Sequence, residues 1–166
     1  MNENLISVDI EEYSDNYRDQ VKSLIHNVYE LERGMHSKSG RPDLDAIKEI
    51  YQENNGNFWI AVKDGKVIGT IGLINQGENR ASMHRFCVDK DFRGRDKGVS
   101  AKLYSTFLGF ARSHSYKKIF LGTAFNAKAA IKFYERNGFV KIISLPEDIA
   151  KNSRLLHDEL FYELDL

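Results

Sequence analysis

The sequence has a single cysteine, Cys87, and only two prolines among its 166 residues. A lone cysteine cannot form an internal disulfide, which favours a reducing compartment, and we therefore expect a cytoplasmic protein. No apolar run approaches the roughly 20 residues that a membrane helix requires, and the amino terminus is acidic where a secretory signal would be basic. The length fits one domain spanning residues 1–166.

An excess of charge of either sign is also lacking, because 24 lysines and arginines balance 24 aspartates and glutamates. Without a global positive field, neither nucleic acid nor an anionic membrane is an expected partner, and any anionic ligand must be held locally. His26, His36, His114 and His157 show no metal-ligand spacing with one another or with Cys87. No metal site is therefore predicted.

Hydrophobic periodicity predicts a mixed α/β sheet. Asp64-Gly65 lies between two β-rich runs and is the strongest hairpin signal in the chain. The strands that end at Val88 and Thr123 are joined by a helix, so they are predicted to be parallel. Predicted strands cover residues 5–10, 58–63, 66–74, 81–88, 117–124, 139–143 and 161–166. Predicted helices cover residues 17–28 (capped by Ser14), 41–53, 98–114 and 126–138. The segment 144–159 is less regular.

A charged loop leads from the strand at 81–88 to a helix that begins at Gly98. The unpaired N–H groups and the dipole of such a helix start suit a phosphate or diphosphate, and Arg93, Arg95 and Lys97 add positive charge. Glycine lets a ligand approach closely. The alternative is a solvated turn. Neither the P-loop pattern nor the dinucleotide fingerprint is present.

The segment Arg95–Ser100 resembles motif A of the GNAT superfamily of N-acetyltransferases, in which [QR]-x-x-G-x-[GA] follows a strand ending in valine. Ser100 stands where glycine or alanine is usual. The loop after Val88 is two residues longer than is common in that family, so Arg93 competes with Arg95 for the arginine role.

A later stretch resembles the N-x-x-A-x-x-x-Y-x-x-x-G-F segment of the same family, with four residues in register: Ala130, Tyr134, Gly138 and Phe139. Ala127 occupies the asparagine position, and Asn126 lies one residue early. Ala127, Ala130 and Tyr134 fall on one helical face, which leaves room for a ligand beneath a tyrosine. The alternative is that the two alanines pack on the sheet.

The resemblance implies a GNAT-like α/β (α+β) fold: a mixed, mostly antiparallel central sheet, helices on both faces, and splayed parallel strands at the cofactor site. It implies acetyl-CoA as acyl donor, with its diphosphate on the amides of Lys97–Ser100. Terminal strands often pair between subunits in this family, which allows a homodimer. The cofactor-binding residues that it implies are Phe86, Cys87, Val88, Arg93, Arg95, Asp96, Lys97, Gly98, Val99, Ser100, Ala127, Ala130 and Tyr134.

The implied activity is acetyl transfer from acetyl-CoA to a primary amine of a small molecule or peptide, by direct attack through a tetrahedral intermediate. Tyr134 is the family's candidate general acid, and a backbone N–H near Val88 is the oxyanion donor. His84 is a candidate base, because strand alternation places it on the face of Phe86 and Val88 and because its ordinary pKa is near 6.5. A satisfied strand histidine is the alternative, and Cys87 is expected to be a small core residue.

Two other functions stay open at this stage. Because this chain lacks the asparagine of the motif and its base is not identified, a CoA-binding sensor or protein-interaction module without turnover is one alternative. A structural domain without a ligand is the other. The resemblance assigns the acceptor groove to segments 35–44 and 144–159, whose mixed composition does not identify the amine.

Overall fold

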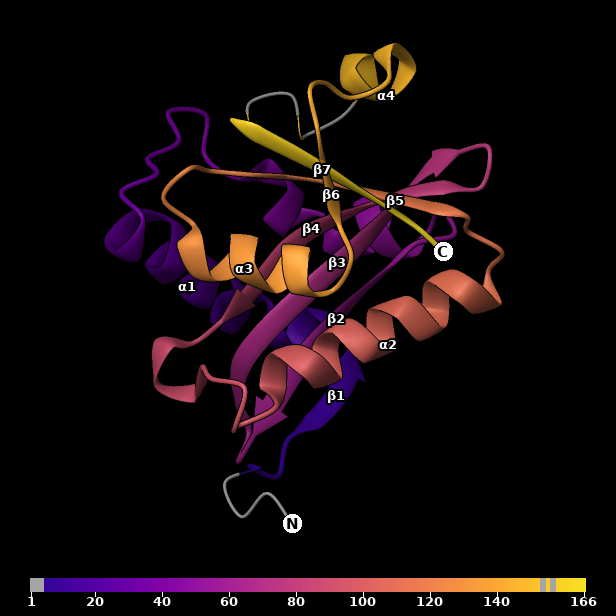
Figure 1. The fold of residues 1–166 in the computed structure, drawn as a ribbon. Coiled ribbons are helices and arrows are strands. Elements are labelled where there is room, and N and C mark those ends of the chain that lie inside the picture. The colour runs from indigo at the N-terminus through magenta and orange to yellow at the C-terminus, as the bar shows by residue number, and fades with distance from the viewer. Residues whose placement is uncertain (1–4, 153–154, 156–157) are drawn as a thin grey trace.

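We describe residues 5–152, 155 and 158–166 in a computed structural model of the chain, shown in Figure 1. These residues form a seven-stranded sheet in the order β1-β2-β3-β4-β5-β7-β6, in which only the β4–β5 pair is parallel. The mixed, mostly antiparallel sheet predicted from the sequence is thus confirmed. Its strands are β1 (Asp9–Glu12), β2 (Asn57–Lys63), β3 (Lys66–Gly77), β4 (Arg80–Val88), β5 (Lys118–Thr123), β6 (Val140–Ile142) and β7 (Leu160–Asp165).

The hairpin predicted around Asp64-Gly65 connects β2 to β3. Both turn residues have positive φ, 50° at Asp64 and 76° at Gly65, as a two-residue hairpin turn requires. Lys63 pairs with Lys66 on either side of the turn, and Trp59 pairs with Ile71 deeper in the sheet.

Four α-helices and several shorter 3-10 or π turns connect the strands in the described part of the chain. The helices predicted at 98–114 and 126–138 are confirmed as α2 and α3. The helix predicted at 41–53 is instead two short turns, interrupted at Ala46, whose φ of −139° is not helical. Ser14 contributes its carbonyl, not its side chain, to the first turn. The helical elements are η1 (Asp15–Tyr17), α1 (Arg18–His26), η2 (Asn27–Glu32), η3 (Pro42–Asp45), η4 (Lys48–Gln52), η5 (Lys90–Phe92), α2 (Val99–Ser113), α3 (Lys128–Arg136) and α4 (Glu147–Asn152).

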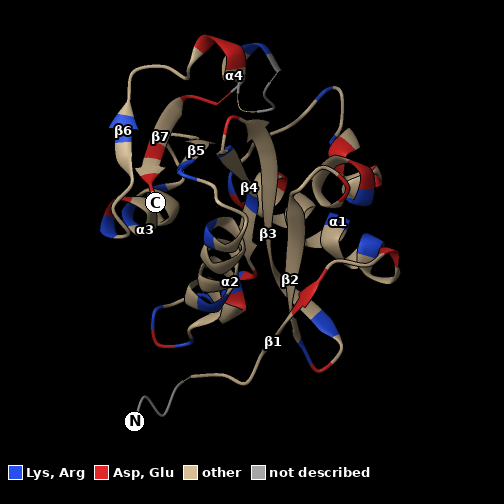
Figure 2. Ribbon diagram, turned by 90° about the vertical axis from the view of Figure 1, so that its right-hand side faces the viewer, with Lys and Arg blue, Asp and Glu red and all other residues tan. Residues whose placement is uncertain are grey.

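The two faces of the sheet are covered by different parts of the chain. Helices α2 and α3 pack on one face, where Leu103, Phe107 and Tyr134 join the larger core. Helix α1 and the turns η2 to η4 cover the other face, where Ile25 and Tyr51 are fully buried. Figure 2 shows that lysine, arginine and acidic residues intermix along the helices, whereas the central strands carry few of them. No helix in the described part of the chain is both long and apolar enough to cross a bilayer.

The parallel strands β4 and β5 separate along their length. They pair only from Arg80–Ser82 to Lys118–Phe120, although both strands continue beyond these residues. A β-bulge in β4 accompanies the separation: His84 pairs with Gly72 and Cys87 with Thr70, so two residues of β4 oppose Ile71 alone. Bulges bend the strand that carries them. The splay that the resemblance implies is therefore present, and it opens the sheet between β4 and β5.

Candidate active site

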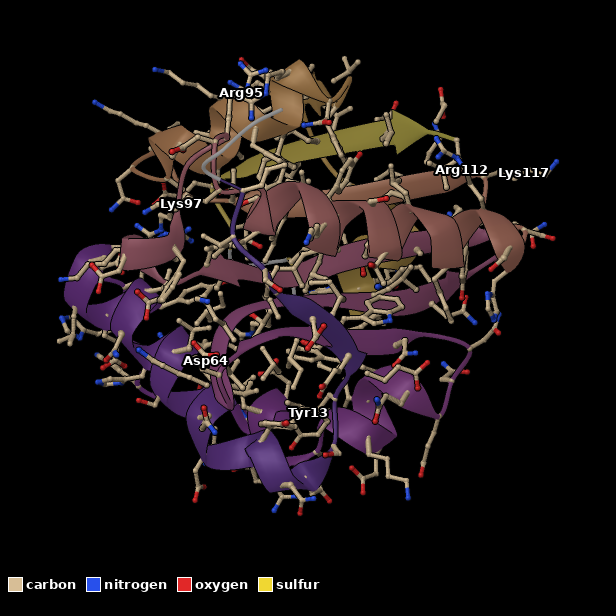
Figure 3. All side chains as sticks on the ribbon, turned by 90° about the horizontal axis from the view of Figure 1, so that it is seen from below. Tyr13, Asp64, Arg95, Lys97, Arg112 and Lys117 are labelled. Atoms are coloured by element: carbon tan, nitrogen blue, oxygen red, sulfur yellow. The ribbon has the colours of Figure 1, made fainter. Side chains whose placement is uncertain are left out.

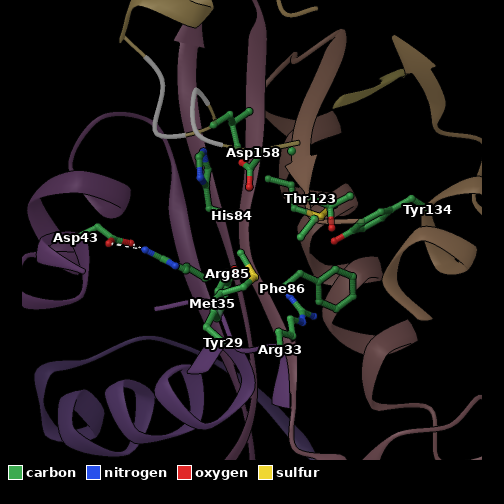
Figure 4. A pocket seen from close by; sticks show the side chains of 14 residues that line it. Tyr29, Arg33, Met35, Asp43, His84, Arg85, Phe86, Thr123, Tyr134 and Asp158 are labelled. Atoms are coloured by element: carbon green, nitrogen blue, oxygen red, sulfur yellow. Dashed lines mark hydrogen bonds and ion pairs between the residues drawn. The ribbon is translucent and has the colours of Figure 1, made fainter. Parts of the chain in front are cut away.

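A pocket lies where β4 and β5 diverge, and six parts of the chain contribute to it (Figure 4). Its walls come from η2 and the residues after it, Asp43 of η3, the bulge of β4, the end of β5, helix α3, and the segment before β7. Both residues predicted to be catalytic, Tyr134 and His84, line this pocket.

Tyr134 enters the pocket from α3 with its ring held by other aromatic side chains. The ring centres of Phe139, Tyr162 and Phe86 lie 5.7, 6.3 and 6.5 Å from it. The residue is 7% exposed, and its hydroxyl points toward the pocket without a hydrogen-bond partner among the described residues. Burial raises the pKa of Tyr134 above its ordinary value of 10. The phenol is therefore protonated at neutral pH and can donate a proton.

The two alanines on α3 already have protein contacts. Ala127 is the buried N-cap of α3, and its carbonyl accepts the N–H of Ile131. Ala130 packs against the larger core. The preceding Asn126 donates from Nδ2 to the carbonyl of Arg33 at 2.8 Å, and this bond connects the start of α3 to the end of η2.

The start of α2 leaves backbone donors open. Gly98 is the N-cap of α2 and has a φ of 77°, which favours glycine. The N–H groups of Lys97 and Gly98 donate to the carbonyl of Gly94, at 3.1 and 3.4 Å. The next three N–H groups, those of Val99, Ser100 and Ala101, have no acceptor among the described residues. The free donors are thus displaced toward the helix relative to the predicted stretch of 97–100.

Some charged side chains of this loop have hydrogen-bond or ion-pair partners within the protein, and others are exposed. The guanidinium of Arg93 donates to the carbonyl of Val88 at 2.8 Å and pairs with Glu32 at 2.6 Å. Lys97 donates from Nζ to the carbonyl of Asp91. Arg95 is exposed and has no partner among the described residues, and Figure 3 shows it on the outer surface near Lys97. Asp96 is exposed as well.

His84 does not share a face of the sheet with Phe86 and Val88, so the predicted alternation is wrong here. Phe86 and Val88 belong to the core on the α2 and α3 side, whereas the His84 ring packs at 6.2 Å from Tyr51 on the opposite side. The bulge is the cause, because an extra residue shifts the alternation that follows it. The Nε2 atom of His84 lies 2.6 Å from Ser82 Oγ, and Cys87 is buried in the core, as expected.

Sequence reasoning missed an ion pair that holds the bulge. Arg85, whose φ is 52°, donates from Nε and Nη2 to the two carboxylate oxygens of Asp43 at 2.9 and 2.8 Å. Tyr51 donates its hydroxyl to the same carboxylate, and Asp43 is 1% exposed. The only signal in the sequence was an arginine in the middle of a buried strand, which usually needs a partner.

Two more charged residues of the pocket were not singled out from the sequence. The Arg33 guanidinium carbon lies 5.3 Å from the centre of the Tyr29 ring, on the pocket wall. Asp158 lies against Gly122 on β5, where an added Cβ would collide with its carboxylate. No local motif marks either residue.

The fold thus combines a sheet that splits between β4 and β5, a buried phenol that lines the split, and a helix start with open amides. A family model described as the acetyltransferase (GNAT) family matches residues 25–139. The chain therefore belongs to the GNAT family of acetyltransferases.

Individual relatives and solved structures are similar over most of the chain. The chain is 34% identical over 127 residues to an N-acetylaspartate synthetase of Xenopus tropicalis, which covers 75% of this chain and 46% of that protein. It is 34% identical over 119 residues to a probable N-acetyltransferase camello of the same organism, which covers 70% of this chain and 53% of that one. The chain thus spans about half the length of these two relatives. A GNAT-family acetyltransferase from Staphylococcus aureus Mu50 superposes with a TM-score of 0.88 at 28% identity, covering 96% of this chain and 99% of the other.

Proposed function

We propose that this chain is a single catalytic domain that transfers an acetyl group from acetyl-CoA to a primary amine. The observation that carries the proposal is the buried phenol of Tyr134, which lines the pocket in the opening between β4 and β5. Such an opening leaves strand edges free to pair with the amides of an extended ligand.

The donor would lie along β4, with its pantetheine arm beside Phe86, Cys87 and Val88. Its diphosphate would bind at the open N–H groups of Val99–Ala101, where the α2 dipole also favours negative charge. Arg95 is the better candidate for an added phosphate contact, because Arg93 already has two protein partners. Contacts from the remaining predicted residues, including Asp96, Ala127 and Ala130, belong to the same proposal.

The reaction proceeds by direct attack of a neutral amine on the thioester carbonyl. A C–N bond forms, the C–S bond breaks, and the amine proton passes to a base, for which His84 on the pocket wall is proposed. Tyr134 donates its proton to the leaving sulfur. The N–H of Asp89 donates to Ile68 on β3, so in an extended strand the N–H of Val88 points the other way, toward the opening, where it can stabilise the oxyanion.

Binding and turnover are tested separately. Saturation with CoA at about 100 times its dissociation constant should stabilise the domain by roughly 2.7 kcal/mol and raise its Tm by about 5 to 10 °C. Acetyl-CoA with a panel of amines should then release free thiol in an amine-dependent manner. A Tm increase without amine-stimulated release would instead favour a CoA-binding module, and no shift at all would contradict both functions.

Replacing Gly98 with alanine tests the diphosphate site. An alanine at this position must adopt a φ of 77°, which is unfavourable for a residue with a side chain. Its Cβ would lie 2.7 Å from a methyl group of Leu5, next to the open amides. We expect Gly98→Ala to weaken CoA binding about tenfold or more, as measured by calorimetry. The matched control is Gly65→Ala, which has nearly the same φ, 76°, with nothing near its Cβ. Equal CoA affinity in the two variants would place the diphosphate elsewhere.

A cytoplasmic location and a homodimer are further parts of the proposal. The single cysteine, which is buried and free, supports a reducing compartment. Exposed apolar side chains at the outer strand β6 support pairing with a second copy of the chain. Val140 on this strand is 63% exposed, and Ile143, directly after it, is fully exposed.

A further inference from the structure

Resting on the proposed acetyl transfer, we propose that the acceptor amine carries a carboxylate and that Arg33 binds it. The site would thus select zwitterionic, amino-acid-like substrates over simple amines. The charged side chains of the pocket are paired unequally, and this difference points to a carboxylate ligand.

Of the two guanidinium groups on the pocket wall, one is already neutralised. Arg85 is bound at both ends of its fork by the buried carboxylate of Asp43. Arg33 has no carboxylate partner among the described residues, and stacking on the Tyr29 ring positions its guanidinium without cancelling its charge. A fixed, unneutralised guanidinium is suited to bind a carboxylate in a two-pronged geometry.

The position of Arg33 favours a contact with the acceptor amine over a contact with the acetyl-CoA donor. Arg33 lines the same pocket as Tyr134, where the thioester would lie, whereas the proposed diphosphate site is at the start of α2. Figure 4 shows Arg33 and Tyr134 reaching the pocket from different elements, with Asp158 at another side of it. Asp158 places a negative charge in the pocket that can attract the acceptor's ammonium group before it loses its proton.

The test compares matched acceptors that differ only at the carboxylate. Amino acids, their carboxamides and the corresponding decarboxylated amines are assayed by thiol release with the wild-type protein and with Arg33→Met. The wild type should prefer the acids over the amides by at least about 30-fold in kcat/KM, and Arg33→Met should remove most of this preference. The loss should appear mainly in KM, because the carboxylate is bound equally before and during the reaction.

Arg41→Met is the matched control. Arg41 stacks on the same Tyr29 ring at 5.2 Å, but it pairs with Glu30 and does not line the pocket. This variant should keep the preference for acids. Calorimetric binding of the same acids and amides to the CoA complex gives a second readout that does not need turnover.

The outcomes separate the inference from the proposed function. Equal turnover of acids and amides by the wild type, or an Arg33→Met variant that loses CoA affinity instead of acid preference, would overturn the role of Arg33 while acetyl transfer stands. If no amine releases thiol, the proposed function fails, and Arg33-dependent binding of acids would still support a carboxylate site. Binding of acids and amides with equal affinity would overturn the proposed carboxylate site at Arg33.

Discussion

Replacing Tyr134 with phenylalanine is expected to lower kcat by about 100-fold or more while leaving the dissociation constant of CoA within about twofold. The hydroxyl faces the pocket without a hydrogen-bond partner among the described residues, whereas the ring is held by Phe86, Phe139 and Tyr162. The substitution therefore removes a proton donor and keeps the packing. Thiol release under saturating substrates and calorimetry with CoA measure the two quantities.

Tyr104→Phe is the matched control for this variant. Tyr104 is equally buried, at 7% exposure, and burial raises its pKa to about 12, but it lies on α2 and does not line the pocket. Its kcat should stay close to that of the wild type. Because burial also raises the pKa of Tyr134 above 10, titration of this phenol should cause no loss of activity below about pH 10. An unchanged kcat in Tyr134→Phe would remove Tyr134 from the mechanism.

The largest effect on stability is expected for Asp43→Asn. Asp43 is 1% exposed, and its carboxylate accepts hydrogen bonds from both prongs of Arg85 and from Tyr51. Removing one partner of a buried ion pair leaves the other charge uncompensated and costs about 3 kcal/mol or more. For a chain of this length, the Tm should fall by about 6 to 12 °C, measured by calorimetry or circular dichroism.

The neighbouring Asp45→Asn substitution controls for the general loss of a carboxylate. Asp45 is in the same turn, and it pairs with Lys22 at the surface, where the two side chains are 62% and 45% exposed. Exposed pairs contribute at most about 1 kcal/mol, so its Tm should change little. Similar Tm values for the two variants would show that the Asp43–Arg85 pair does not hold the bulge.

What could be predicted from the sequence was encoded locally. The hairpin turn depends on two adjacent residues, Asp64 and Gly65, and helices α2 and α3 follow from stripes of apolar residues at helical spacing. The pocket position of Tyr134 agrees with a motif confined to one helix and its end. Such features need no information from the rest of the chain.

What could not be predicted depends on partners far apart in the sequence. The side of the sheet that His84 occupies is set by a bulge opposite Ile71, and the bulge carries an arginine paired with a carboxylate 42 residues away. That carboxylate belongs to Asp43, which is buried in η3, within the stretch where the sequence pattern predicted a continuous helix. Arg33 reaches the pocket only because η2 lies beside the split in the sheet. Periodicity contains none of these contacts.

A crystal structure of the chain with bound CoA would test the central claim most directly. We expect diphosphate oxygens within about 3 Å of the backbone nitrogens of Val99, Ser100 or Ala101, and the sulfur between β4 and β5 within hydrogen-bond reach of the Tyr134 hydroxyl. A diphosphate bound away from the start of α2, or a sulfur outside the opening between the two strands, would contradict the account.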